Sequence, residues 1–301
     1  MNQIDYTTTS PRFSVTDNKQ LDEGFTYLNA HGYVVISDVM SQDEVNMNKE
    51  LLWKFIESVS NSTIKRDDPE TWPSFSSHGV INGLGIGQSE FLWSVRSNRQ
   101  VKNIFARLWN TRQLLVSFDG CGVYRDWRYN STWKTNDSWD HVDQNPKLKP
   151  DRCCIQGIVS LTDQNQRISG LIVYPRTHLR FTELWDITKN SRDFVQVSSD
   201  HAITLVKLLV KRVRPASMST QKTRCSTRGI FCVSLIQTLD EFREKRKQLV
   251  KNNCTTTHWS TELVLSLGNH TDPPKLSLDR FDAYQKALIF GTDDENDFCL
   301  P

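Results

Sequence analysis

The spacing of apolar residues changes after the first third of the chain, and this change constrains the fold more than any other feature of the sequence. Apolar residues recur at helical spacing over Gln20–Ala30, from the Ser41–Glu44 capping box as far as Ile56, and over Glu90–Trp109. From Leu114 onward they occur instead in short runs separated by polar turns. Helices followed by many short strands predict an α+β domain with a mainly β core, arranged as a sandwich or barrel.

The expected strands of this β-rich part share β-branched, aromatic and other apolar residues, and they are Leu114–Phe118, Gly120–Tyr124, Cys153–Leu161, Gly170–Tyr174 and Gly229–Ile236. A shorter strand, Tyr33–Ile36, follows the first helix, which we expect to end at Gly32. Asp240–Lys251 predicts a charged helix. Residues 1–18 are polar and aperiodic and predict a flexible leader. We expect residues 19–301 to form a single domain with an N-terminal helical module and a C-terminal helix and tail.

Charge and cysteine usage exclude several classes of protein. The net charge is +2, and the 37 Lys and Arg residues are spread along the chain, which argues against nucleic-acid binding. The seven cysteines form no C-x-x-C pair, and an odd number fits reduced intracellular thiols better than a disulfide framework. No apolar run approaches the ~20 residues that span a bilayer, and no secretory signal opens the chain. We therefore expect a soluble, cytoplasmic protein without membrane or nucleic-acid partners, and the sequence leaves its oligomeric state open.

Several short motifs fail as catalytic or binding signatures. The glycines of Gly83-Leu-Gly85-Ile-Gly87 lack the G-x-G-x-x-G spacing of a nucleotide loop, and no Lys-Ser/Thr pair follows them. No G-x-S-x-G elbow marks a serine nucleophile. Cys153 and Cys154 fall in an expected strand, where core packing is the simpler interpretation.

His141-Val142-Asp143 is the strongest candidate for chemistry. Residues i and i+2 of a strand project to the same side, so the imidazole and the carboxylate can bind one face of a metal ion. Two His and one carboxylate with open positions are typical of non-haem Fe(II) oxygenases. However, seven His and 35 acidic residues give about 0.8 chance occurrences of His-x-Asp/Glu in a chain of this length. A surface His beside an acid is therefore the alternative.

Six segments carry a further signal through their order, and they are Ile64–Trp72, Gln88–Trp93, Leu115–Gly120, Trp139–Pro146, Cys154–Gly157 and Gly170–His178. With Gly32–Asp38 before them and Thr255–Trp259 after them, they resemble the microbial and fungal members of the phytanoyl-CoA dioxygenase family. The resemblance covers about residues 20–265. It implies a double-stranded β-helix, or jelly roll, that holds Fe(II) and 2-oxoglutarate, with His141 and Asp143 as the first two metal ligands. It also implies a small-molecule substrate, hydroxylated at an aliphatic carbon.

The chain departs from the family pattern at the third metal ligand. By spacing alone, His178 would serve, because it lies 37 residues after His141 at the end of an apolar run. In the relatives, however, the similar Gly-Leu-x-Val-x-Pro-Gly-Ser/Thr-His segment is a strand and turn, and its His is not a ligand. The resemblance implies that the distal His belongs to a later stretch of the type Pro-Gly-Asp-Leu-x-Leu-Trp-Asp-Ser-Arg-x-x-His.

That later stretch is incomplete in this chain. Pro215–Met218 resembles its start, and Arg228 resembles the arginine that binds the carboxylate of 2-oxoglutarate on the next strand. Residues 219–227 contain no His, so we expect one core strand to be shortened or missing. Arg228 has a plainer interpretation as a solvated charge beside Arg224. His201 and His258 are the other downstream imidazoles that do not lie near the C-terminus, and neither lies in a matching strand.

Three hypotheses follow from this gap. The first is an Fe(II)/2-oxoglutarate-dependent oxygenase that is impaired because its distal His is absent. The second is a catalytically inactive paralogue that serves as a binding or scaffold protein. The third is a gene-model error that skipped the coding segment for the distal strand, which a contiguous complementary-DNA read across codons 213–230 would reveal.

Overall fold

The computed structural model describes residues 10–72, 79–134, 140–163, 171, 173–187, 193–197, 240–266 and 274–291. The chain divides into two compact units, each assembled from three segments. The first unit comprises Met1–Val39, Tyr124–Cys153 and Thr162–Arg224, and the second comprises Met40–Val123, Cys154–Leu161 and Cys225–Pro301. The single domain over residues 19–301 stays a prediction.

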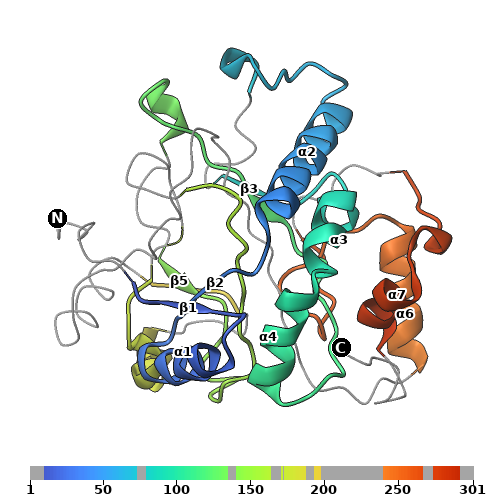
Figure 1. Ribbon diagram of the computed structural model, residues 1–301. Helices are drawn as coiled ribbons and strands as arrows, with labels where there is room; N and C mark the ends of the chain where they lie inside the picture. The colour runs from blue at the N-terminus through green and yellow to red at the C-terminus, as the bar shows by residue number, and fades with distance from the viewer. Residues whose placement is uncertain are drawn as a thin grey trace. The chain divides into compact units, whose positions relative to one another are not determined.

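The first unit begins with a helix between two paired strands (Figure 1). Strand β1 (Arg12–Ser14) falls within the expected leader and pairs in parallel with β2 (Val35–Ser37). Helix α1 (Asn18–His31) begins where the Asp17 side chain accepts hydrogen bonds from two backbone N–H groups. It ends at Gly32, whose left-handed φ of 79° lets its N–H reach the Leu28 carbonyl. The expected helix and its glycine end are confirmed.

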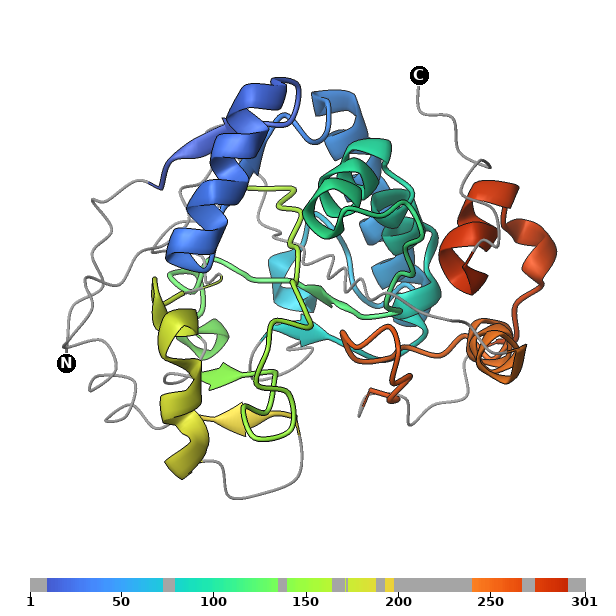
Figure 2. The same ribbon diagram turned by 90° about the horizontal axis from the view of Figure 1, so that it is seen from below.

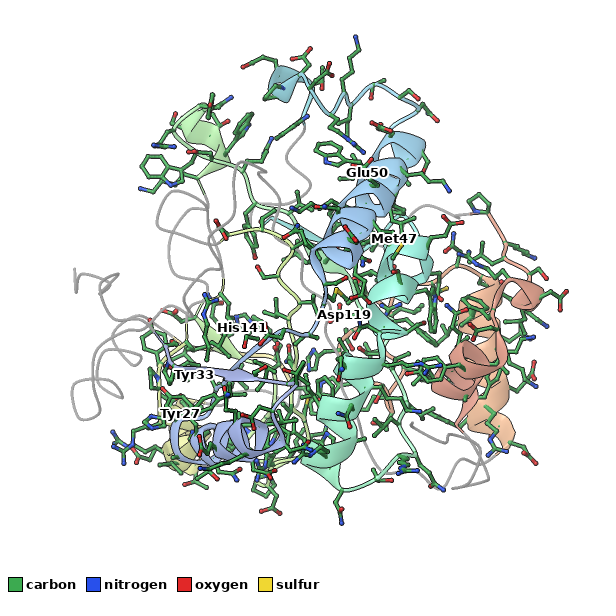
Figure 3. All side chains as sticks on the ribbon, in the orientation of Figure 1. Tyr27, Tyr33, Met47, Glu50, Asp119 and His141 are labelled. Carbon is green, nitrogen blue, oxygen red and sulfur yellow. The ribbon has the colours of Figure 1, made fainter. Side chains whose placement is uncertain are left out.

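Two tyrosines join this helix to the segment before β2. The Tyr27 and Tyr33 hydroxyl groups are 2.9 Å apart, and the two rings meet edge to face with centroids 5.5 Å apart (Figure 3). Burial, and then the bond to Tyr33, raise the pKa of the Tyr27 hydroxyl well above its usual range. The Tyr27 hydroxyl therefore stays protonated at neutral pH.

The rest of the first unit is built around an antiparallel pair of strands (Figure 2). Strand β5 (His141–Val142) pairs with β6 (Val195–Gln196), and the 3₁₀ helix η4 (Thr177–Ile187) lies beside them. Leu184 of η4 and Val197 form a small core, against which Val142, Tyr174 and Phe181 pack. A short 3₁₀ helix, η3 (Ser131–Trp133), precedes β5.

Several helices of the second unit begin at side-chain caps. Helix α2 (Gln42–Val59) has the complete Ser41–Glu44 capping box that the sequence predicts. The single helix expected over Glu90–Trp109 is wrong, because the chain forms α3 (Glu90–Arg96) and α4 (Arg99–Trp109). The break comes at Asn98, whose side chain accepts from the first N–H groups of α4.

The remaining elements of the second unit are short strands and two C-terminal helices. Strands β3 (Val80–Ile81) and β4 (Cys121–Gly122) pair antiparallel. Helix α6 (Asp240–Lys251) is the charged helix that the sequence predicts, and α7 (Ala283–Phe290), which it does not predict, lies beside α6 in Figures 1 and 2. The described part of the unit also contains three 3₁₀ turns, η1 (Pro69–Thr71), η2 (Ile86–Gln88) and η5 (Leu278–Arg280).

Two expected strands of the β-rich part are not strands in the structure. Leu114–Phe118 and Cys153–Leu161 are described throughout and belong to no ladder. Hydrogen-bond partners explain why Leu114–Phe118 is not a strand. The Val116 N–H donates to the Leu288 carbonyl, and the Phe118 N–H donates to the Thr256 hydroxyl. The buried backbone is thus satisfied by irregular partners instead of a regular strand.

The described residues therefore combine helices with three two-stranded sheets, without a closed barrel. The α+β class is confirmed in this coarse form, whereas the jelly roll and its shortened strand stay predictions. Gly170–Tyr174 lies partly, and Gly229–Ile236 wholly, outside the described residues. Among the helices that the structure describes, none has the length and apolar character needed to cross a bilayer.

A buried arginine holds together the core of the second unit. Arg246 of α6 has no exposed surface, and its guanidinium donates to the backbone carbonyls of Val116 (2.6 Å), Ser260 (2.8 Å) and Ile289. Burial lowers the pKa of Arg246 to about 9. One side chain on α6 thereby fixes three otherwise separate stretches of backbone.

Candidate functional site

His141 and Asp143 lie together in the first unit, as their spacing predicts. His141 begins β5, Asp143 follows it directly, and both side chains are half-buried. The Nε2 atom of His141 is 3.4 Å from Oδ1 of Asp143. The two side chains therefore converge on one side of the strand end, where Figure 3 labels His141.

The register of β5 and β6 separates a core face from an open face. Val142 is paired with Val195, and both side chains pack inward. His141 is paired with Gln196, which is exposed. Because directly paired residues share a face and alternate residues return to it, His141, Asp143, Phe194 and Gln196 are all assigned to the open face.

Hydrogen bonding in the ladder brings the side chains of this open face close together. Val197 N–H donates to the Asp140 carbonyl at 2.9 Å, so residues 140 and 197 form a hydrogen-bonded pair. The next pair, His141 and Gln196, is then a non-hydrogen-bonded pair, the kind in which opposing Cα atoms are only about 4.5 Å apart.

An aromatic ring orients the His141 imidazole. Phe194 stacks on it with ring centroids 4.7 Å apart and an interplanar angle of 30°. Phe194 itself is 40% exposed, so it covers one side of the imidazole while facing solvent with its own outer side. The stack restricts rotation of the imidazole and leaves Nε2 directed at Asp143.

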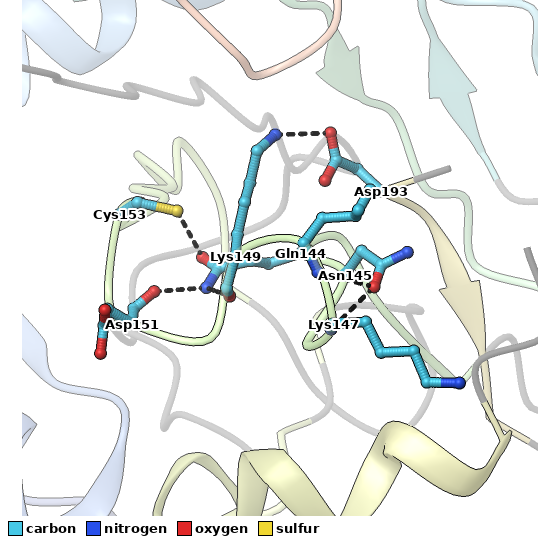
Figure 4. Close-up of polar contacts among 8 residues, drawn as sticks. Gln144, Asn145, Lys147, Lys149, Asp151, Cys153 and Asp193 are labelled. Atoms are coloured by element: carbon cyan, nitrogen blue, oxygen red, sulfur yellow. Dashed lines mark hydrogen bonds and ion pairs between the residues drawn. The ribbon is translucent and has the colours of Figure 1, made fainter. Parts of the chain in front are cut away.

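A compact loop follows Asp143, and polar side chains close it (Figure 4). The Gln144 amide donates to the carbonyls of Lys149 and Asp151, each at 2.6 Å, and accepts from the Cys153 thiol at 3.2 Å. Fully buried Asn145 accepts from two further backbone N–H groups of the loop. The loop therefore has a defined conformation.

The loop is also tied to the partner strand. Nζ of Lys149 lies 2.6 Å from Oδ2 of Asp193, which comes two residues before β6. The side chains of both residues are only 23% and 20% exposed, so solvent screens this ion pair less than a surface pair. Sequence reasoning missed Gln144, Lys149 and Asp193, because their roles depend on contacts with residues that no local pattern identifies.

The His141 and Asp143 geometry fits two ligands of one metal ion. Two donor atoms that each lie about 2.1 Å from a metal at roughly a right angle are about 3 Å apart. The observed 3.4 Å is close to this separation, and it also suits a plain ion pair with a protonated His. Within the described part of the chain, no group of three or more His, Cys, Asp and Glu could hold a metal.

His178 lies at the end of α1. Its Nε2 atom is 2.9 Å from the carbonyl oxygen of Asn29, in the last turn of that helix. A Cβ atom built on Gly32 would come within 2.4 Å of the His178 ring, so the imidazole lies directly on the helix end. The expected secondary role of His178 as a substitute ligand therefore gains no geometric support.

The other predicted site residues divide between the described and undescribed parts of the chain. Arg228, the His-free stretch 219–227 and His201 lie outside the described residues. His258 belongs to the second unit and lies beside the Trp259 ring, with centroids 5.0 Å apart. The co-substrate role of Arg228 stays a prediction.

Comparison with known proteins bears on this geometry. No family model matches the chain. A curated protein from Dictyostelium discoideum, "Putative phytanoyl-CoA dioxygenase", is 26% identical over 204 residues, which cover 55% of this chain and 58% of that protein. The chain is thus a distant homologue of a protein that bears this name. "Ava biosynthesis cluster protein O" of Aspergillus versicolor is 25% identical over 178 residues, which cover 56% of this chain and 55% of that protein.

The chain spans slightly more than half the length of the curated relatives that it matches. Two solved structures share its fold. A hypothetical protein from Escherichia coli has a TM-score of 0.55 at 9% identity, with 94% of this chain and 86% of that chain covered. A "Putative Oxidoreductase" from Salmonella typhimurium LT2 has a TM-score of 0.53 at 11% identity, with 93% and 86% covered. At these identities the likeness concerns the fold alone.

Proposed function

We propose that the chain is a non-haem Fe(II)/2-oxoglutarate-dependent oxygenase of the phytanoyl-CoA dioxygenase type, with a weakened metal site. The observation that carries this proposal is the convergence of His141 Nε2 and Asp143 Oδ1, 3.4 Å apart at the end of β5. The curated relatives support the oxygenase class through the name of one of them. The proposed substrate is a small molecule with an aliphatic carbon to be hydroxylated.

Three side chains of this chain would have separate binding roles in such a site. His141 offers a neutral imidazole nitrogen, and Asp143 offers a carboxylate that also neutralises part of the charge of a cation. Arg228 is the residue that the family resemblance assigns to the carboxylate of 2-oxoglutarate, where a guanidinium could bind bidentately. Iron and 2-oxoglutarate, when bound, supply the redox chemistry that activates O₂.

The weakening follows from the ligand count. The sequence lacks a His in 219–227, and the described residues add no third His, Cys, Asp or Glu to the pair. A site with one imidazole and one carboxylate loses a strong neutral donor, so its affinity for Fe(II) falls. The same absence favours a second candidate function, an inactive paralogue that retains the fold as a binding or scaffold protein.

An anaerobic Co(II) titration, followed by the visible absorption of bound cobalt, tests the metal site. We expect weak binding by the wild-type chain and at least tenfold weaker binding by His141→Ala and by Asp143→Asn. His178→Ala is the matched control, since it removes an imidazole from the same unit, and it should bind Co(II) like the wild type. Loss of binding in His178→Ala instead would identify His178 as the third ligand.

Succinate formation tests the proposed weakening, and binding of Co(II) and 2-oxoglutarate separates the two candidate functions. With Fe(II), O₂ and 2-oxoglutarate, the weakened oxygenase should form little or no succinate, detected by proton NMR. Robust turnover would contradict the proposed weakening. Wild-type protein that binds neither Co(II) nor 2-oxoglutarate would favour the inactive paralogue over the oxygenase.

A further inference from the structure

We propose that Gln144 is a positioning residue that fixes Asp143 for metal binding, by closing the loop that follows this carboxylate. The inference rests on the proposed function, because it concerns the same metal site. It adds a role for a side chain that neither the sequence pattern nor the family resemblance singles out.

Gln144 uses both donors and the acceptor oxygen of its side-chain amide in hydrogen bonds within the loop. Its Nε2 has two N–H groups, which donate to the carbonyls of Lys149 and Asp151, and its Oε1 accepts from the Cys153 thiol. One side chain thus joins the start of the loop to three positions near its end (Figure 4). Asparagine offers the same amide group on a side chain that is one methylene shorter.

The closure matters for Asp143 because Gln144 is its chain neighbour. The backbone of residue 143 is held on one side by β5, where Val142 pairs with Val195. On the other side, the loop that begins at Gln144 holds it. With Gln144 bound to three loop partners, the peptide after Asp143 has little freedom, so the carboxylate stays near His141.

A second tie fixes the closed loop relative to β6. Lys149, whose carbonyl accepts from Gln144, carries the ammonium that pairs with Asp193. Phe194, the next residue, stacks on His141. The same set of contacts therefore supports both metal-binding side chains, the carboxylate through Gln144 and the imidazole through Phe194.

Gln144→Met tests this role, since methionine keeps the volume and removes all three hydrogen bonds. We expect about tenfold weaker Co(II) binding and a changed visible spectrum of the bound metal, because outer contacts of this kind typically control affinity by 10–100-fold. Gln88→Met is the matched control. Gln88 is a buried glutamine of the second unit that likewise bridges two groups, Trp93 and the Cys254 carbonyl, and its loss should leave the cobalt spectrum unchanged.

The outcomes separate the inference from the function on which it rests. If the wild type and Gln144→Met bind Co(II) alike, the positioning role is wrong and the proposed function stands. If Gln88→Met loses as much affinity, general destabilisation explains the effect and the positioning role is also wrong. A wild-type chain that takes up no Co(II) overturns the proposed function.

A second variant guards against poor folding of Gln144→Met. Lys149→Met keeps the Gln144 bonds to the backbone and removes the tie to Asp193. It should weaken Co(II) binding less than Gln144→Met but more than Gln88→Met. In the metal-free protein, amide hydrogen exchange over residues 141–153 should accelerate in both loop variants, and unchanged exchange would contradict closure by these contacts.

Discussion

At the scale of single residues, Arg246 is a fully buried side chain held by three hydrogen bonds. Its three acceptors are backbone carbonyls, which no substitution elsewhere can remove. Arg246→Met should therefore leave buried carbonyls without donors and lower the free energy of unfolding by about 3 kcal/mol or more. Urea unfolding measures this loss, and Lys245→Met, an exposed position on the same helix, is the control. Equal midpoints for the two variants would contradict the assigned role.

Lys102 gives the stability a defined pH dependence. Burial, and then nearby Arg112, lower the pKa of this lysine to about 8, while its Nζ lies 4.9 Å from the Tyr284 ring. In the unfolded chain a lysine has a pKa of about 10.4, so between about pH 8 and 10.4 the unfolded state binds more protons. The contribution of Lys102 to stability is therefore unfavourable below pH 8 and improves as the pH rises through this window.

Lys102→Met should accordingly raise the melting temperature at pH 7, because it removes a partly buried charge. The gain should shrink between pH 8 and pH 10.4, where the wild-type lysine loses its proton. Thermal unfolding of both proteins at pH 7 and pH 10 measures the difference. A gain of the same size at both values would show that packing, and not the charge, is responsible.

At the scale of elements, the end of α1 explains what His178 does. The Asn29 carbonyl lies in the last helical turn, where acceptors lack partners within the helix, and His178 contacts it at 2.9 Å. His178→Ala should lower the free energy of unfolding by about 1 kcal/mol. His178→Gln, whose amide can still donate, should retain most of the stability. Chemical denaturation measures both, and an unchanged midpoint in His178→Ala would refute the capping role.

The register of β5 and β6 predicts where the metal site could be strengthened. Gln196 is paired with His141 on the open face, so a second imidazole at that position would join the existing pair. Gln196→His should therefore bind Co(II) at least tenfold more tightly than the wild type. Gln196→Asn is the control for the substitution itself. Equal affinities for all three proteins would mean that position 196 does not reach the metal.

Helices were predictable from the sequence because their signals are local. Ser41 and Glu44 identify the start of α2, and Gly32 identifies the end of α1, within a few residues of the chain. The break at Asn98 was missed, since the apolar spacing continues across it and only the cap interrupts the helix.

The strands could not be predicted in the same way, because pairing depends on distant residues. Val116 and its neighbours have the composition of a buried strand, yet their partners are the end of α7 and Thr256. For the candidate site, the sequence predicts the convergence of His141 and Asp143 from their spacing alone. It does not identify Phe194 or Gln144 as supports, since both act through contacts formed only in the folded chain.

At the scale of the whole molecule, the likeness in fold covers more of the chain than the likeness in sequence. The fold extends to bacterial structures at 9% and 11% identity, whereas the curated relatives match this chain over little more than half its length. A shared fold does not transfer a function, so the proposed activity depends on the His141 and Asp143 pair and on the groups that hold it.

The central claim is that this pair still binds iron, and an anaerobic calorimetric titration with Fe(II) tests it most directly. In the presence of 2-oxoglutarate, the wild-type chain should show one weak binding site, and His141→Ala should show none. An absence of binding heat in the wild type, or the same heat in His141→Ala, would contradict the account.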